Sequence, residues 1–166
     1  MDGLPNWMHA PRIEGWYADD LDNIPELPPH TEMLHGNFVF RRFPQPVRHE
    51  LHVTAVASAL TEQTPPGARV VRGASIRLDQ RNRFEPDLLV TTAAHDPNRT
   101  CFTPDEVLLI AEMVSPESAH WNRVVKPRKY AEAGIARYWL VEEEHCAPAV
   151  HAYELDAPTG KYTMLS

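Results

Sequence analysis

The 166-residue chain lacks several features that would place it in a familiar class of protein. Its only cysteines, Cys101 and Cys146, form no CxxC pair, so neither a disulfide framework nor a structural zinc site is indicated. No apolar run reaches the roughly 18 residues that a membrane span needs, and the N-terminus has no secretory pattern. We therefore expect a cytoplasmic protein without a membrane segment.

Glycine and excess positive charge are also scarce. The seven glycines form no glycine-rich phosphate loop, and there is no GxSxG motif. The segment from His49 to His52 is one residue short of the HExxH zinc motif. A formal net charge of −7 argues against a general nucleic-acid binder, because neutralising phosphates drives that affinity. Basic residues are nevertheless grouped at 41–48, 69–83 and 123–129, so the sequence leaves open the formation of a local basic face.

The composition itself is that of an ordinary soluble protein. Hydrophobic residues make up 43% of the chain and charged residues 23%. At this length we expect one domain, 1–166, with one sizeable core. Prolines interrupt residues 1–30, so this N-terminal segment is predicted to be partly irregular, with one short helix at 12–23.

The apolar patterns predict an α/β fold in which helices flank a mixed β-sheet. A hairpin is expected at 31–42 with Gly36 and Asn37 at its tip, and a helix between Pro46 and Pro65. Pro127 is awkward in the second helix, which must either begin close to it or bend there, and Gly134 ends that helix. The predicted strands lie at 69–78, 87–92, 107–114, 136–142, 150–155 and 161–165.

Three residues in these elements suggest chemistry. Asp87 begins one predicted strand and Glu112 lies near the end of another, so the two acids converge if the strands pair antiparallel. Carboxylate oxygens suit Mg²⁺, which keeps several waters and needs only one or two such ligands. Lys126, in the following helix, could orient a water or stabilise developing charge. Taken alone the pattern is weak, because strand-end acids and helix-surface lysines are common.

Several motifs together strengthen the interpretation of these residues as a metal-dependent site. They occur in one order along most of the chain: EMLHG at 32–36, His49 at the start of a helix, PD at 86–87, AEMVSPES at 111–118, NRVVKPRKYAEAG at 122–134 and RYWLVE at 137–142. With them, the chain resembles the Uma-two family of restriction-endonuclease-like proteins within the PD-(D/E)xK nuclease superfamily. The PD dipeptide alone would not identify the family, whereas the ordered set of motifs is specific for it.

The resemblance implies a restriction-endonuclease-like fold and a Mg²⁺-dependent endonuclease acting on DNA, with Mn²⁺ as a substitute. Glu32, Asp87 and Glu112 would be the acidic site residues that bind metal. The superfamily's E-x-K lysine would fall at position 114, which is Val114, so Lys126 takes that role by resemblance. His49 would line the site, and a homodimer is expected by analogy, because a duplex offers two strands.

Position 122 departs from the family pattern. The family usually has an aspartate four residues before the helix lysine, whereas this chain has Asn122, which can still cap a helix. A second hypothesis is therefore a catalytically inactive nuclease fold that serves as a binding or regulatory module. With no obvious DNA-reading element, the chain could also depend on another protein partner. Tyr130 is expected in the core and Glu85 on the surface.

Overall fold

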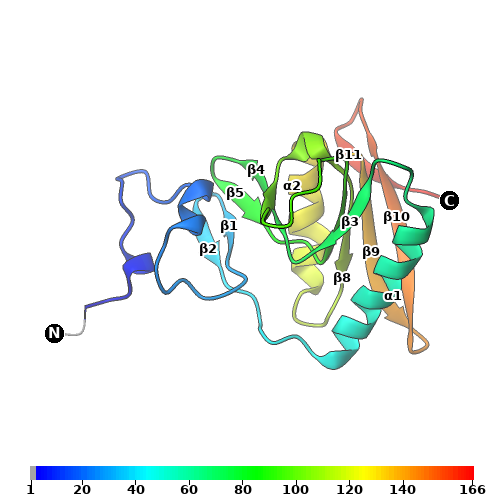
Figure 1. Cartoon of the computed structure of the whole chain (residues 1–166), viewed down its shortest axis with the longest axis horizontal. Coiled ribbons are helices and arrows are strands. Elements are labelled where there is room, and N and C mark those ends of the chain that lie inside the picture. Colours follow the sequence, from blue (N-terminus) through cyan, green and yellow to red (C-terminus); the bar gives the residue numbers. More distant parts are fainter. Residues whose placement is uncertain (1–2) are drawn as a thin grey trace.

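The computed structural model describes residues 3–166 and contains two β-sheets rather than the single sheet expected (Figure 1). The larger sheet has the strand order β11-β10-β9-β8-β6-β3 and the smaller has β2-β1-β5-β4-β7. The strands are β1 Glu32–Leu34, β2 Asn37–Val39, β3 Arg69–Arg72, β4 Ser75–Asp79, β5 Asn82–Phe84, β6 Leu88–Thr91, β7 Cys101–Phe102, β8 Val107–Met113, β9 Arg137–Glu144, β10 Ala147–Asp156 and β11 Lys161–Met164.

Two α-helices and four short helical segments accompany the sheets. They are α1 Val47–Gln63 and α2 Lys126–Glu132, the 3₁₀ turns η1 Asn6–Met8, η2 Ala18–Asp22 and η3 Pro104–Glu106, and the π-helical turn η4 Trp121–Val125. β8 and β9 pair in parallel while the other pairs of the larger sheet are antiparallel, which confirms the mixed α/β class. No helix within residues 3–166 combines the length and the apolar character that crossing a membrane requires.

Strand β8 organises the core because its two faces pack against different helices. Leu109, Ala111 and Met113 belong to one buried cluster with the inner face of α1. Ile110 belongs to the other cluster, which includes Tyr130 of α2. The strand predicted at 107–114 is thus covered on both faces, and alternation along it places Glu112 on the α2 side.

Two local predictions were wrong. The strand expected at 69–78 is broken at Gly73, whose φ of +64° few other residues adopt, and its halves β3 and β4 join different sheets. The helix expected at 12–23 shrinks to η2, and Ile13, within the predicted range, is fully exposed. Isolated short helices are marginal without a face to bury, which explains the second outcome.

The predicted hairpin is present, with its tip one residue earlier than expected. His35 and Gly36 form the tip with φ of +52° and +78°, while Asn37 already belongs to β2. The backbone conformation at Gly36 favours glycine, and a Cβ there would also displace the guanidinium of Arg81. The hairpin fixes Glu32 in β1, beside β5.

Candidate active site

Lys126 lies at the centre of the candidate site. It is fully buried at the first position of α2, and its Nζ is 2.8 Å from Oε1 of Glu112 and 2.8 Å from Oε1 of Glu32. The same ammonium lies 3.4 Å from the carbonyl oxygen of Glu85. A charged lysine is costly to bury without partners, and these oxygens supply them. The structure therefore brings the predicted lysine to two of the predicted acids.

The π-helical turn before α2 explains how the lysine reaches this position. Its hydrogen bond joins the Lys126 N–H to the Trp121 carbonyl, five residues back, and this wide turn brings both side chains toward Glu32. The indole Nε1–H of Trp121 donates to Glu32 Oε2 at 3.1 Å. Pro127 follows this wide turn at once. The helical residues begin at Ala119 and run without a break to Glu132, so the alternative in which the helix begins close to Pro127 is not the observed one. The irregularity lies in the π-helical turn directly before the proline.

Glu112 is completely buried, and only one of its two carboxylate oxygens has hydrogen-bond partners. Its Oε1 accepts hydrogen bonds from Lys126 and from the hydroxyl of Tyr130, each at 2.8 Å. Its Oε2 is shielded from solvent and has no hydrogen-bond partner among residues 3–166. Burial raises the pKa of the Glu112 carboxyl to about 7; Lys126 opposes this rise and the nearby Asp87 adds to it. One buried carboxylate oxygen is thus available to a ligand.

Asp87 immediately precedes β6, and β6 pairs antiparallel with β8, as convergence of the two acids requires. Asp87 Oδ2 accepts a 2.7 Å hydrogen bond from the backbone N–H of Met113, the residue after Glu112. Burial alone would raise the pKa of Asp87, but the hydrogen bond to His49 and the charge of Arg41 outweigh it, and the pKa is lowered. Asp87 is therefore held as a carboxylate beside Glu112.

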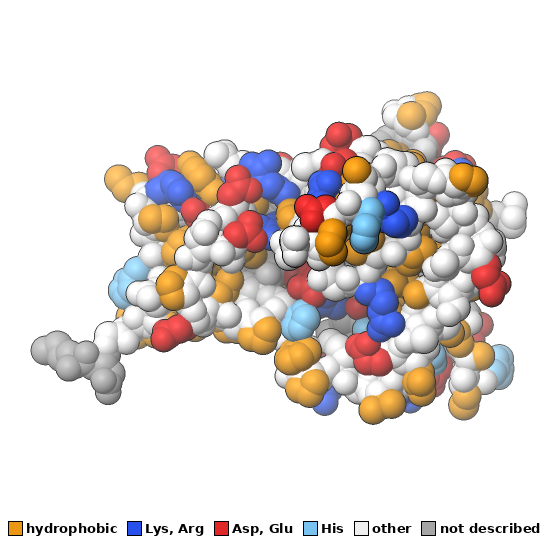
Figure 2. Space-filling model, viewed as in Figure 1, with side chains coloured by type: hydrophobic (Ala, Val, Ile, Leu, Met, Phe, Trp, Pro, Cys, Tyr) orange, Lys and Arg blue, Asp and Glu red, His pale blue; other side chains and the backbone are white. Residues whose placement is uncertain are grey.

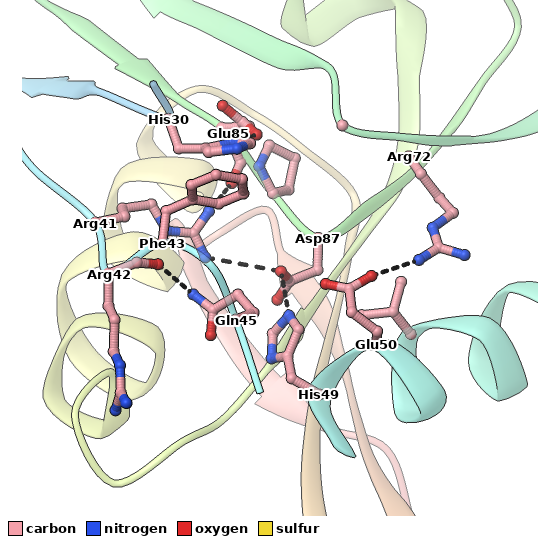
Figure 3. Close-up of a pocket in the computed structure, with 13 residues that line it drawn as sticks. His30, Arg41, Arg42, Phe43, Gln45, His49, Glu50, Arg72, Glu85 and Asp87 are labelled. Atoms are coloured by element: carbon pink, nitrogen blue, oxygen red, sulfur yellow. Dashed lines mark hydrogen bonds and ion pairs between the residues drawn. The ribbon is translucent and has the colours of Figure 1, made fainter. Parts of the chain in front are cut away.

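His49 and Arg41 approach Asp87 from the open side (Figure 3). His49 Nε2 lies 3.1 Å from Asp87 Oδ1, and the pKa of His49 is raised because this carboxylate outweighs the opposing effect of burial. Arg41 Nη2 lies 3.7 Å from Asp87 Oδ1, while its Nη1 donates to the Glu85 carbonyl at 2.6 Å. His49 thus lies near the start of α1 with its ring beside Asp87.

Glu32 differs from the other two acids because both of its oxygens are engaged. Oε1 accepts the Glu85 N–H at 2.6 Å in addition to Lys126, and Oε2 accepts Trp121. Within residues 3–166, Glu32, Asp87 and Glu112 do not all bring an oxygen within 4.8 Å of one another, since Lys126 lies between Glu32 and Glu112. Glu32 is thus placed to hold the lysine.

The site opens onto two hollows that share basic side chains. One, of about 380 Å³, is lined by Asp87 and by residues of the segment before α1; the other, of about 310 Å³, lies toward Met113 and Trp121. Arg41, Arg42 and His49 line both. Figure 2 shows the surface hollowed between the two parts of the molecule, with acidic, basic and histidine side chains around the hollow. Basic side chains thus border the hollows together with acidic ones and do not form a purely basic face.

Asn122, the departure from the family pattern, is fully buried. Its side-chain Nδ2 donates to the Met113 carbonyl at 2.9 Å and to the Ser118 hydroxyl at 3.2 Å. An ionised aspartate could not donate these two hydrogen bonds, although the amide's own Oδ1 is buried without a hydrogen-bond partner in residues 3–166. The expectation that Asn122 caps a helix is wrong, because it lies within the π-helical turn and makes no cap hydrogen bond; it fixes the backbone after Glu112 instead.

Three contributors to the site were missed by sequence reasoning. Tyr130 was assigned to the core, although its position four residues after Lys126 places both on one helix face and so near Glu112. Trp121 carried no signal, because five-residue spacing does not share a face in a regular α-helix. Arg41 was visible only as one of several grouped arginines, and nothing in its spacing distinguished it.

Comparison with solved structures concerns the fold as a whole. A putative nuclease belonging to DUF820, from Anabaena variabilis, superimposes with a TM-score of 0.64 at 17% sequence identity, over 89% of this chain and 82% of that one. The cAAA-bound NucC of P. aeruginosa gives a TM-score of 0.42 at 10% identity, over 75% of each chain. No protein with a curated description matches the sequence.

The family assignment comes from the sequence itself. Residues 18–166 match the sequence profile of the family Uma2, described as "Putative restriction endonuclease", which confirms the resemblance read from the ordered motifs. The match spans the hairpin, both α-helices and the two sheets, and the DUF820 structure shows the same nuclease fold. The chain therefore belongs to the Uma2 family.

Proposed function

We propose that this protein is a metal-dependent endonuclease that hydrolyses DNA phosphodiester bonds at the site around Glu112. The observation that supports this most is the buried Glu112 Oε2, which has no hydrogen-bond partner among residues 3–166. A buried carboxylate oxygen costs free energy unless a donor or a cation faces it. With Asp87 held ionised alongside, the two acids offer an oxygen-only donor set that fits Mg²⁺, or Mn²⁺ in its place.

A bound divalent cation would polarise the scissile phosphate and lower the pKa of an attacking water. Lys126 would orient that water or stabilise the developing charge, because its ammonium is fixed by Glu112 and Glu32 within the same site. Glu32 contributes by positioning this lysine rather than by binding metal directly. Tyr130, which donates to Glu112 Oε1, leaves the other oxygen of that carboxylate open.

The open side would receive the substrate. Arg41 and His49 border Asp87 on the side of the hollows, where a phosphate backbone could be neutralised by the guanidinium groups. Arg48 and Arg72 lie on neighbouring parts of the rim. Because a duplex presents two strands, we expect a homodimer to cut both.

The alternative of a non-catalytic binding module has one specific observation in its favour. Lys126 is fully buried, and both oxygens of its partner Glu32 are engaged, so the lysine is fixed in place as it would be in a purely structural ion cluster. In that case Asp87 and Glu112 would stabilise the fold without chemistry. The two functions differ in whether metal binds and whether DNA is cut.

Cleavage of supercoiled plasmid with Mg²⁺ or Mn²⁺ tests the proposal. Wild type is compared with Asp87→Asn and Lys126→Met, and with the matched controls Asp96→Asn, in an exposed loop, and Lys129→Met, on the outer part of α2. Nicking that requires the added metal and is lost in Asp87→Asn and Lys126→Met, but kept in both controls, is the expected result.

Calorimetry with Mg²⁺ separates the remaining outcomes. Cutting that persists in Asp87→Asn would overturn the site. Absence of both cutting and metal binding in wild type would favour the binding module. Metal binding that depends on Asp87 and Glu112 without plasmid cutting would retain the metal site and reject duplex DNA alone as the substrate.

A further inference from the structure

The hairpin of β9 and β10, beside α1 at the lower right of Figure 1, gathers a second set of metal-ligating side chains. Glu142 and Glu144 are two residues apart on β9, so they share one face of the sheet. In the antiparallel register His151 pairs with Leu140, and it therefore projects to the same face. We define Glu142, Glu144 and His151 as the hairpin cluster.

The distances within this cluster suit a small cation. His151 Nε2 lies 3.5 Å from Glu142 Oε2 and 3.4 Å from Glu144 Oε1. Zinc bonds nitrogen and oxygen ligands at about 2.0–2.2 Å, so neighbouring ligand atoms of a tetrahedral site lie roughly 3.3–3.5 Å apart. All three residues can offer a ligand atom within 4.8 Å of the others.

The imidazole nitrogen supplies an independent observation. His151 Nε2 is shielded from solvent and makes no hydrogen bond to any group in residues 3–166, despite the two nearby carboxylates. A shielded ring nitrogen that faces two carboxylates without bonding to either is a preformed ligand position rather than a satisfied ion pair.

Charge also favours a cation here. Arg123 holds the outer oxygen of Glu142, with its Nε donating to Oε1 at 2.8 Å, which leaves Oε2 directed at the histidine. Glu144 has no lysine or arginine partner in the described chain, 3–166. The neighbouring Glu143 projects to the opposite face, where His52 and Arg48 approach it, so it does not compete. One negative charge beyond the Arg123 pair is thus uncompensated when His151 is neutral.

We propose that the hairpin cluster binds a borderline divalent cation of the zinc class, at a site separate from the oxygen-only site around Glu112. Imidazole together with carboxylates is a donor set that zinc prefers, whereas Mg²⁺ favours oxygen alone. Solvent reaches 22% of the Glu142 side chain, 52% of Glu144 and 31% of His151. A cation held there therefore keeps an open coordination position toward water. This proposal does not rest on the endonuclease function.

The test uses the intact chain, stripped with a chelator and supplied with excess Mg²⁺ to occupy any oxygen-only site. Zn²⁺ affinity is measured by competition with a chromophoric chelator, and Co²⁺ replaces Zn²⁺ to report tetrahedral geometry by its visible absorption. Wild type is expected to bind one equivalent of Zn²⁺. His151→Gln and Glu144→Gln are each expected to bind it roughly 10- to 100-fold more weakly, at least what loss of a supporting partner costs a metal site.

His95→Gln is the matched control, because it removes an exposed loop histidine and should leave the affinity unchanged. Equal Zn²⁺ affinity in wild type and His151→Gln would overturn the proposal, as would wild type that binds no stoichiometric Zn²⁺. Glu144 is half-exposed and its substitution should not disturb folding, so an effect on binding in that variant can be separated from unfolding.

Discussion

Two groups of acids lie at opposite extremes of solvent exposure in this protein. Glu32, Asp87 and Glu112, with Lys126, form what we call the inner cluster, where the side chains of Glu32, Glu112 and Lys126 have no solvent exposure. The hairpin cluster is partly open to water and has Arg123 as its one strong cationic partner in residues 3–166. The residue types are similar, yet burial makes the first group part of the fold and leaves the second on its surface.

This difference in burial shows in which cluster a substitution can change ligand binding without changing the stability of the fold. In the inner cluster one ammonium is shared by the buried carboxylates of Glu32 and Glu112, so removing it leaves buried acids without that partner. In the hairpin cluster the side chains are partly exposed to water, and ion pairs there are worth little to folding. A substitution should therefore lower the free energy of unfolding in the inner cluster and affect mainly ligand binding in the hairpin cluster.

Lys126→Met should give the largest effect. It leaves Glu112 and Glu32 facing each other without a cation, and we expect a loss of about 3–5 kcal/mol in the free energy of unfolding. Urea unfolding followed by tryptophan fluorescence measures it. Lys129→Met, which removes only a partly exposed pair with Glu132, should cost about 1 kcal/mol or less. Similar losses in the two variants would erase the contrast between buried and exposed ion pairs.

Glu112 should make stability depend on pH. Its folded pKa of about 7 lies above that of the unfolded chain, so its contribution is complete below the unfolded value and is lost as the pH rises through about 7. Glu112→Gln removes this dependence. Between about pH 5 and about pH 8, wild type should lose about 2–3 kcal/mol relative to that variant. Chelator-treated samples and urea unfolding give the comparison, and a flat difference would contradict the raised pKa.

Asn122→Asp should destabilise less, by about 1–2 kcal/mol near neutral pH, because a carboxylate would face the Met113 carbonyl that the amide now serves. The loss should shrink as the pH is lowered, since a protonated aspartic acid can again donate. Asn98→Asp, in an exposed loop, is the control and should change little. If Asn122→Asp matched wild type at all pH values, the amide would not be needed to fix the backbone after Glu112.

His151→Gln should have the smallest effect on folding. With metal removed, its midpoint of thermal unfolding should stay near that of wild type, because a partly exposed side chain without hydrogen bonds contributes within about 0.5 kcal/mol. Adding Zn²⁺ should then raise the wild-type midpoint alone, since a ligand that binds only the folded state stabilises it. A large loss without metal would place the hairpin cluster among the structural groups.

The sequence predicted much of the fold and the main acids of the site. The continuous apolar run of β8 and the proline-bounded α1 are strong signals, and the ordered motifs led to Asp87, Glu112 and Lys126. The split of the 69–78 segment between two sheets rests on the backbone of one glycine, which periodicity does not report. The engagement of Glu32 depends on Trp121, and that contact requires a π turn that no apolar pattern signals.

The π-helical turn also limits how the gene can change. A π turn holds one residue more than a regular α-helical turn, so deletion of one codon within 121–125 would leave Trp121 and Lys126 four residues apart, a spacing that shares one face of a regular α-helix. An inserted codon would instead turn Lys126 away from Glu32 and Glu112 if Trp121 kept its place. Single-base changes that alter Arg123 or Val124, whose side chains are exposed, keep the spacing of Trp121 and Lys126. Across descendants of this gene, insertions in this segment should be rarer than changes of its surface residues.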